Sequence, residues 1–203
     1  SSGITQRLVD LCLVFVGRFS GGLGMVNVST SMLFGGISGS STSDTASIGS
    51  VLIPEMKKRG YPLSYASGIT VASSTMGMIL PPSIPMVLYA VSAQVSVGKL
   101  FLGGIIPGLM VGILQLCIAV WISKRNNYPK ENAEGSWKRC FTAVSQSVHI
   151  LIMPVFVVGV VVFGIATATE SAALGGLYAL GIGIFFMRFL TLKSFYESLL
   201  SAA

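Results

Sequence analysis

Apolar stretches separated by short polar breaks make up almost the whole chain. We predict helices over 5–19, 23–34, 45–56, 65–77, 83–93, 100–123, 147–165 and 171–187. Several of these stretches approach the roughly 20 apolar residues that a helix needs to cross the hydrocarbon core of a bilayer. The pattern therefore predicts an all-α integral membrane protein.

A run of small and oxygen-bearing residues interrupts the first apolar stretches. It reads Gly-Gly-Ile-Ser-Gly-Ser-Ser-Thr-Ser-Asp over residues 35–44, between the short helices 23–34 and 45–56. A membrane tolerates irregular backbone only where it is buried in protein or lines a cavity, and a carboxylate there indicates a functional site. We therefore predict a re-entrant hairpin whose tip, including Asp44, holds an ion or a substrate.

A second interruption follows in the next long apolar stretch. Small and polar residues at 72–77 precede Pro81, Pro82 and Pro85. Prolines remove backbone donors and disfavour helix at the residue before them, so we predict a discontinuous helix with halves at 65–77 and 83–93. Kinked helices without any site also exist, but two interrupted elements in one chain indicate a transporter binding site near the membrane midplane.

Composition and charge agree with a membrane protein. The mean hydropathy is +0.79, and charged residues make up 10% of the chain, against about 25% in soluble domains. The net charge of +6 comes from clusters between apolar segments, which is typical of cytoplasmic loops and argues against a nucleic-acid partner. With the hairpin entering and leaving on the same side, nearly every Lys and Arg lies on one face of the membrane, Lys99 excepted. The three cysteines are too scattered for a disulfide framework or a zinc site.

The predicted parts differ in how they relate to the membrane. Residues 1–20 form an amphipathic arm or the end of a preceding membrane helix. The other parts are the hairpin at 21–60 and the discontinuous helix at 61–98, both in a transport domain, a membrane helix at 99–123, a cytoplasmic loop at 124–140, and truncated scaffold or arm helices of a second half at 141–203. Because the chain opens on Ser1 rather than Met, we expect a piece of a longer protein.

Three polar positions are predicted to be structural. Thr169 is a candidate helix cap, and Glu170 lies near a helix start, where the helix dipole favours a carboxylate. Asn27 fits a hydrogen-bonded amide in the core of the hairpin.

Several short segments, in chain order, carry a resemblance to a known family. They are 25–28, 35–40 with Asp44, 49–54, 57–61, 72–77, 81–86 and 164–173. They resemble the large membrane subunit of tripartite ATP-independent periplasmic (TRAP) transporters over nearly the whole chain. Residues 77–80 depart slightly from the family's more proline-rich pattern.

The resemblance implies a fold, a function and partners. It implies an elevator-type carrier built from inverted repeats, of which this chain is the first repeat and the start of the second, without the second hairpin. It implies sodium-coupled uptake of an organic acid, such as a dicarboxylate or a sialic acid, across the bacterial inner membrane. A periplasmic binding protein delivers the acid, a small membrane subunit completes the scaffold, and no cofactor other than Na⁺ is expected.

The expected site residues are oxygen donors, because sodium is a hard cation. Resemblance places sodium at Ser38, Ser40, Asp44 and Gly77, and Ser74 and Thr75 of the broken helix complete the predicted set. Ser41, Thr42 and Pro82 are the predicted substrate contacts. Asp44 as a helix cap, and the hydroxyls as partners in interhelical hydrogen bonds, are alternatives that the sequence leaves open.

Other functions remain as alternatives. A stand-alone sodium/dicarboxylate symporter of related architecture, or an ion channel, would not depend on a soluble binding protein. A membrane-embedded serine hydrolase is disfavoured because no Gly-x-Ser-x-Gly sequence occurs and the single histidine lies far from the serines. The paired interrupted elements argue against a purely structural subunit. We expect a transporter, not an enzyme.

Overall fold

The structure is a computed structural model that describes residues 2–17, 21–128 and 137–185. Within these ranges it contains helices and no strand, so the all-α prediction is confirmed. The elements are α1 (Ser2–Val16), α2 (Gly22–Ser38), α3 (Ser41–Lys58), α4 (Leu63–Ser74), the 3-10 helix η1 (Thr75–Met78), α5 (Ile84–Ser92), α6 (Val97–Arg125), α7 (Trp137–Val162) and α8 (Ala168–Phe185).

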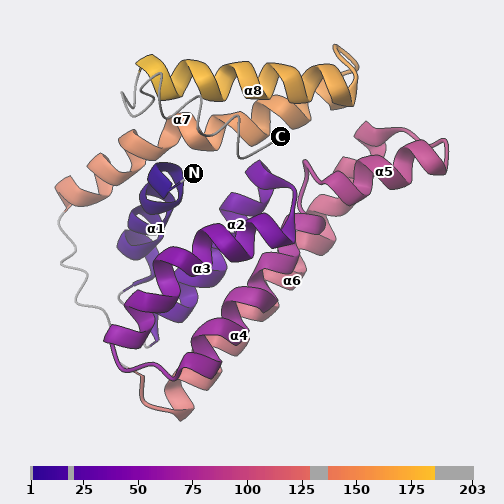
Figure 1. Ribbon diagram of the computed structural model, residues 1–203. Helices are drawn as coiled ribbons and strands as arrows, with labels where there is room; N and C mark the ends of the chain where they lie inside the picture. Colours follow the sequence, from indigo (N-terminus) through magenta and orange to yellow (C-terminus); the bar gives the residue numbers. More distant parts are fainter. Residues whose placement is uncertain (1, 18–20, 129–136, 186–203) are drawn as a thin grey trace.

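Helix α2 is the centre of the molecule. It packs against α1, α3, α4, η1, α6 and α7, while α7 and α8 lie antiparallel along one edge (Figure 1). Leu8, Val26, Ile48 and Leu52 are fully buried or nearly so where α1, α2 and α3 meet. The core therefore holds the α2–α3 hairpin between α1 on one side and α4 on the other.

The hairpin turn is tighter than the sequence predicted. The polar run 35–44 was expected to be non-helical, but α2 continues to Ser38 and α3 already begins at Ser41. Gly39 (φ 63°) and Ser40 (extended) alone make the turn, because glycine adopts the left-handed conformation without strain. Directly after the run, the Thr45 hydroxyl donates to Ser41 O, one turn back in α3, at 2.8 Å.

The broken helix agrees with the prediction. Helix α4 tightens into η1 at Thr75, and the chain is irregular from Ile79 until α5 begins at Ile84. Pro85 lies in the first turn of α5, where a missing N–H costs nothing.

Helix α6 packs on the broken helix through a row of glycines. Gly104, Gly108 and Gly112 recur every four residues and are buried. A Cβ added at Gly108 would lie 2.7 Å from Leu80 Cδ2, so these small residues let α6 pack closely.

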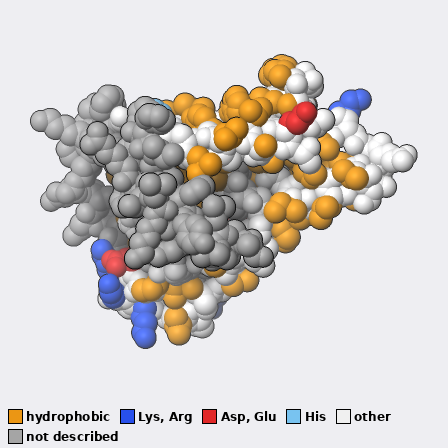
Figure 2. All heavy atoms as spheres, turned by 45° about the horizontal axis from the view of Figure 1, so that its top comes forward, with side chains coloured by type: hydrophobic (Ala, Val, Ile, Leu, Met, Phe, Trp, Pro, Cys, Tyr) orange, Lys and Arg blue, Asp and Glu red, His pale blue; other side chains and the backbone are white. Residues whose placement is uncertain are grey.

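Much of the remaining surface is apolar. Ile106 and Met110 of α6 are 69% and 59% exposed, and hydrophobic side chains cover large parts of the described surface in Figure 2. By length and composition, α6 is the one helix in the described ranges that is suited to cross a membrane, and Ser147–Val162 is a shorter apolar stretch.

Basic residues are segregated along the molecule. The C-terminal ends of α3 and α6, which carry Lys57, Lys58, Lys124 and Arg125, lie at one end, and the start of α6, which carries Lys99, lies at the other (Figure 1). This agrees with the predicted charge asymmetry. Of the remaining basic residues, Arg18, Lys130, Arg188 and Lys193 lie outside the described residues.

Candidate functional site

The hairpin turn holds a buried carboxylate. Asp44 lies in the first turn of α3 and is fully buried. Ser38, the last residue of α2, donates its hydroxyl to Asp44 Oδ1. The same hydroxyl oxygen accepts the N–H of Ser40 at 3.2 Å. These bonds hold Asp44 Oδ1 in place and leave Oδ2 available to another partner.

The free oxygen of Asp44 faces the break in the second element. No described residue donates a hydrogen bond to Asp44 Oδ2, and a Cβ added at Gly77 would overlap this oxygen. That Cβ would also lie 3.3 Å from the carbonyl carbon of Ser40. The structure thus brings Ser38, Ser40, Asp44 and Gly77 together, and only glycine fits at position 77 without displacing the carboxylate.

The carboxylate has no cationic side chain beside it. Among the described residues, the ion pairs join Glu55 to Lys58 and Arg59 at the far end of α3. An uncompensated buried carboxylate is costly, and more so in a membrane. The alternative role, capping of α3, leaves Oδ2 without a donor. A bound cation would satisfy this oxygen and offset its charge.

Ser74 and Thr75 use their hydroxyl groups differently from the other predicted sodium ligands. The Ser74 hydroxyl donates to Thr70 O at 2.7 Å, and the Thr75 hydroxyl donates to Ala72 O at 2.7 Å. Both hydroxyl hydrogens are therefore used within the broken helix. Their role in ion binding remains a prediction.

The two interrupted elements are joined directly. The N–H of Ile84, at the start of α5, donates to Gly39 O of the hairpin turn at 3.2 Å. A Cβ added at Gly39 would lie 2.8 Å from Pro82 O, which shows how closely the two backbones approach. The turn of the hairpin and the start of α5 therefore form one surface.

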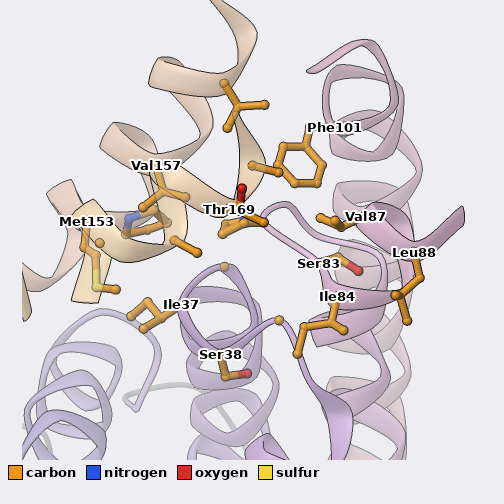
Figure 3. Close-up of a pocket in the computed structure, with 18 residues that line it drawn as sticks. Ile37, Ser38, Ser83, Ile84, Val87, Leu88, Phe101, Met153, Val157 and Thr169 are labelled. Atoms are coloured by element: carbon orange, nitrogen blue, oxygen red, sulfur yellow. The ribbon is translucent and has the colours of Figure 1, made fainter. Parts of the chain in front are cut away.

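A cavity of about 340 Å³ opens on that surface. Its wall comes from the end of α2, the start of α5, α6, α7 and the start of α8 (Figure 3). Most of the lining is apolar, including Ile37, Val87, Phe101 and Val157. This combination of apolar wall and a few polar groups is typical of small-molecule sites.

The polar groups of this cavity are hydroxyls, and no charged residue lines it among those described. Ser38, Ser83 and Thr169 contribute them from three different elements (Figure 3). Of the predicted substrate contacts, Pro82 lines the cavity, whereas Ser41 and Thr42 are not in its wall. Thr42 instead shares a hydrogen bond with the Ser40 hydroxyl at 3.0 Å.

Thr169 and Ser83 were not among the predicted site residues. Thr169 was expected to cap α8, but the cap is Thr167: its hydroxyl accepts the N–H of Glu170 at 3.3 Å, while Glu170 Oε2 accepts the N–H of Thr167 at 2.8 Å. This reciprocal pair is a capping box. It frees Thr169 to face the cavity and confirms the structural role of Glu170. A short polar run between two apolar helices identified the first hairpin, and the same pattern at 167–171 could have indicated a second cavity wall.

Comparison with known proteins now decides the family. The sequence profile of the Tripartite ATP-independent periplasmic transporter, DctM component, matches residues 1–203. The chain belongs to this family. The chain is 40% identical over its full length to the isethionate TRAP transporter permease protein DctMQ of Oleidesulfovibrio alaskensis, of which it covers 32%. It is 39% identical over 93% of its length to the C4-dicarboxylate TRAP transporter large permease protein DctM of Vibrio cholerae, of which it covers 41%.

The name of a third relative gives a different substrate. The sialic acid TRAP transporter permease protein SiaT of Haemophilus influenzae is 34% identical over the whole chain, which covers 33% of it. The chain thus spans about a third to two-fifths of the length of these TRAP permeases. All three relatives are named as transporter permeases, and the matching family is one of transporter components rather than enzymes.

Proposed function

We propose that this chain carries one half of the ion and substrate site of a sodium-coupled TRAP permease. The permease takes up an organic acid across the bacterial inner membrane by an elevator movement, in several membrane passes. A periplasmic binding protein delivers the acid, and a small membrane subunit, separate or fused, completes the membrane part.

The buried carboxylate of Asp44 is the observation that carries this proposal. One oxygen is held by Ser38, and the other has no donor and faces Gly77. Acidic residues inside membranes mark ion and substrate pathways, and a bound ion can offset their charge. The buried Oδ2 atom, to which no described residue donates a hydrogen bond, supports this role.

The donor set fits sodium. Ser38 and Asp44 supply side-chain oxygens, and the hairpin turn at Ser40 and the 3-10 helix at Gly77 supply backbone carbonyls, which are hard ligands of the kind that hard cations prefer. Bound sodium would supply the charge that lets Asp44 remain ionised. Ser38 orients Asp44 Oδ1 through its hydroxyl, so that Oδ2 is left for the ion.

The cavity beside this site is the proposed substrate position. Helices α5 and α8 both begin in its wall, at Ile84 and Ala168, so the positive ends of their dipoles favour a carboxylate. Ser83 and Thr169 add hydroxyl groups, whose partners in the structure are Met78 O and the Thr167 hydroxyl. In this proposal residues of α7 and α8, predicted as scaffold or arm helices, also contact the substrate.

Replacement of Asp44 tests the ion role. We would reconstitute the permease as its gene encodes it, with its small subunit and binding protein, and measure uptake of labelled organic acids with and without a sodium gradient. Asp44→Asn keeps the shape and removes the charge, so we expect uptake to fall by roughly a hundredfold. Glu55→Gln makes the same change at an exposed position of the same helix and is expected to leave uptake unchanged.

The results of this uptake experiment distinguish the proposed function from its alternatives. Uptake that needs sodium, needs the binding protein and is lost in Asp44→Asn supports the proposal. Uptake that is unchanged when sodium is removed and unchanged in Asp44→Asn would refute the ion role. Sodium-driven uptake without any binding protein would instead place the protein among stand-alone symporters.

A further inference from the structure

Two rows of small and polar residues face each other between α2 and α4–η1. On α2 the row is Asn27, Ser31 and Gly35, spaced by four residues, and on the other element it is Thr70, Ser73 and Gly77. The rows meet in pairs: Asn27 with Thr70, Ser31 with Ser73, and Gly35 with Gly77. Successive pairs lie about one helical turn apart, because residues three or four apart share a helix face.

The first two pairs are joined by an ordered chain of hydrogen bonds. Asn27 Nδ2 donates to Thr70 Oγ1 at 2.7 Å, and Asn27 Oδ1 accepts the Ser73 hydroxyl at 3.1 Å. The hydroxyl oxygens of Ser31 and Ser73 lie 2.8 Å apart, and Thr70 passes its own hydrogen to Ala66 O at 2.8 Å. With Ser31 as donor to Ser73, every hydroxyl in the chain uses its hydrogen.

Burial makes this chain of bonds specific. Asn27, Ser31, Thr70 and Ser73 are all fully buried. Sliding α2 by one turn along α4 would leave only one polar pair, because Ser31 would then lie opposite Gly77, or Asn27 opposite Ala66. The buried polar groups that lose their partners in this way are costly. The polar pairs therefore favour one register between the two elements.

The third pair carries that register into the candidate ion site. A Cβ added at Gly35 would lie 3.0 Å from both Cα and N of Gly77, so the two backbones touch there. Gly77 in turn lies against Asp44 Oδ2. A shift of about 5.4 Å, one helical turn, between the rows would move Gly77 away from the carboxylate.

We propose that Asn27, Ser31, Thr70 and Ser73 form a polar clasp that holds the hairpin and the broken helix in the register that the sodium site requires. They are positioning residues: none of them bonds to Asp44 or Ser38 among the contacts of the described residues. This inference rests on the proposed sodium role of Asp44. The clasp sets how tightly sodium binds without contributing a ligand.

Two substitutions at one position separate hydrogen bonding from packing. Thr70→Val keeps the shape of the side chain and removes its hydroxyl, whereas Thr70→Ser keeps the hydroxyl and removes a methyl group. Ser73→Ala removes the central hydroxyl of the clasp. Ser67→Ala is the matched control, because Ser67 lies on the same helix, is exposed, and bonds only to carbonyls of its own helix.

The measurement is the sodium concentration for half-maximal uptake in proteoliposomes, together with the rise in melting temperature of the detergent-solubilised permease on addition of sodium. Interhelical hydrogen bonds in membranes correspond to a factor of roughly 3 each. Ser73→Ala removes two such bonds and should raise the half-saturating sodium concentration about tenfold, whereas Thr70→Val removes one and should raise it about threefold. The half-saturating sodium concentrations of Thr70→Ser and Ser67→Ala should stay near that of the unsubstituted permease.

The outcomes distinguish this inference from the function on which it rests. A sodium-dependent parent whose half-saturation is unchanged in Thr70→Val and Ser73→Ala would overturn the clasp and leave the ion site intact. A fall in maximal uptake or in folded protein alone, without a change in half-saturation, would also overturn it. If uptake by the unsubstituted permease does not depend on sodium, both proposals are overturned. Where Ser73→Ala yields too little folded protein, Ser31→Ala removes the end of the same chain of bonds and gives the same decision.

Discussion

At the residue scale, the candidate ion site depends on the absence of a side chain at Gly77 as much as on the side chains of Ser38 and Asp44. Asp44 and Ser38 could be predicted from sequence, because a carboxylate and hydroxyls amid apolar residues indicate a site. Gly77 was grouped with Asp44 only by resemblance to the family, because glycine has no functional group that marks a site and the contact depends on how α4 tightens into η1. Ser74 and Thr75 show the limit: side-chain chemistry made them candidates, but their hydroxyls bond to carbonyls of their own helix.

Gly77→Ala tests this contact. The added methyl group would overlap Asp44 Oδ2, so we expect the carboxylate to move and the half-saturating sodium concentration to rise at least about tenfold. Gly68→Ala is the control, because a Cβ there meets nothing within 4 Å and alanine favours helix by about 0.5–1 kcal/mol. Equal sodium dependence in both variants would show that Gly77 does not shape the site.

At the element scale, sequence patterns predicted which helices exist better than where they end. The prolines at 81, 82 and 85 located the break between η1 and α5. The hairpin turn was predicted too long, because its small and polar residues are helical on both sides of Gly39 and Ser40. The start of α8 was predicted three residues too late, because Thr167 and Glu170 cap the helix before Ala168.

The capping box at the start of α8 gives a stability prediction. Thr167→Ala removes the cap and should destabilise the permease by about 1 kcal/mol, seen as a lower melting temperature in detergent. Glu170→Gln retains a side-chain acceptor for the Thr167 N–H and should have a smaller effect. A larger loss in Glu170→Gln than in Thr167→Ala would mean that the charge, and not the cap, matters at this position.

At the scale of the whole molecule, five elements far apart in the sequence enclose one cavity. Sequence reasoning found the α2 and α5 walls, because both elements are visibly interrupted. It did not find the α7 and α8 walls, since their apolar positions look the same whether they face lipid, protein or a ligand. Val157 is buried and lines the cavity, while Val155 on the same helix is 72% exposed.

Filling the cavity should block the substrate and spare the ion. Val87→Phe on α5 adds volume to the wall, so we expect uptake to fall while sodium still raises the melting temperature. Val91→Phe, one turn further along α5 at a position that is 69% exposed, is expected to transport normally. If Val87→Phe transports at the normal rate, the substrate does not occupy this cavity.

The hydrogen bond between Ile84 N–H and Gly39 O has a practical consequence for recombining this chain with its relatives. The turn at 39–40 and the segment before α5 fit each other through backbone atoms, so both must come from the same parent. A chimera with a crossover between residues 44 and 79 would pair two halves that never evolved together. Exchange boundaries placed in the α3–α4 connection are therefore poor choices, whereas those in the connection between α5 and α6 keep the fitted pair intact.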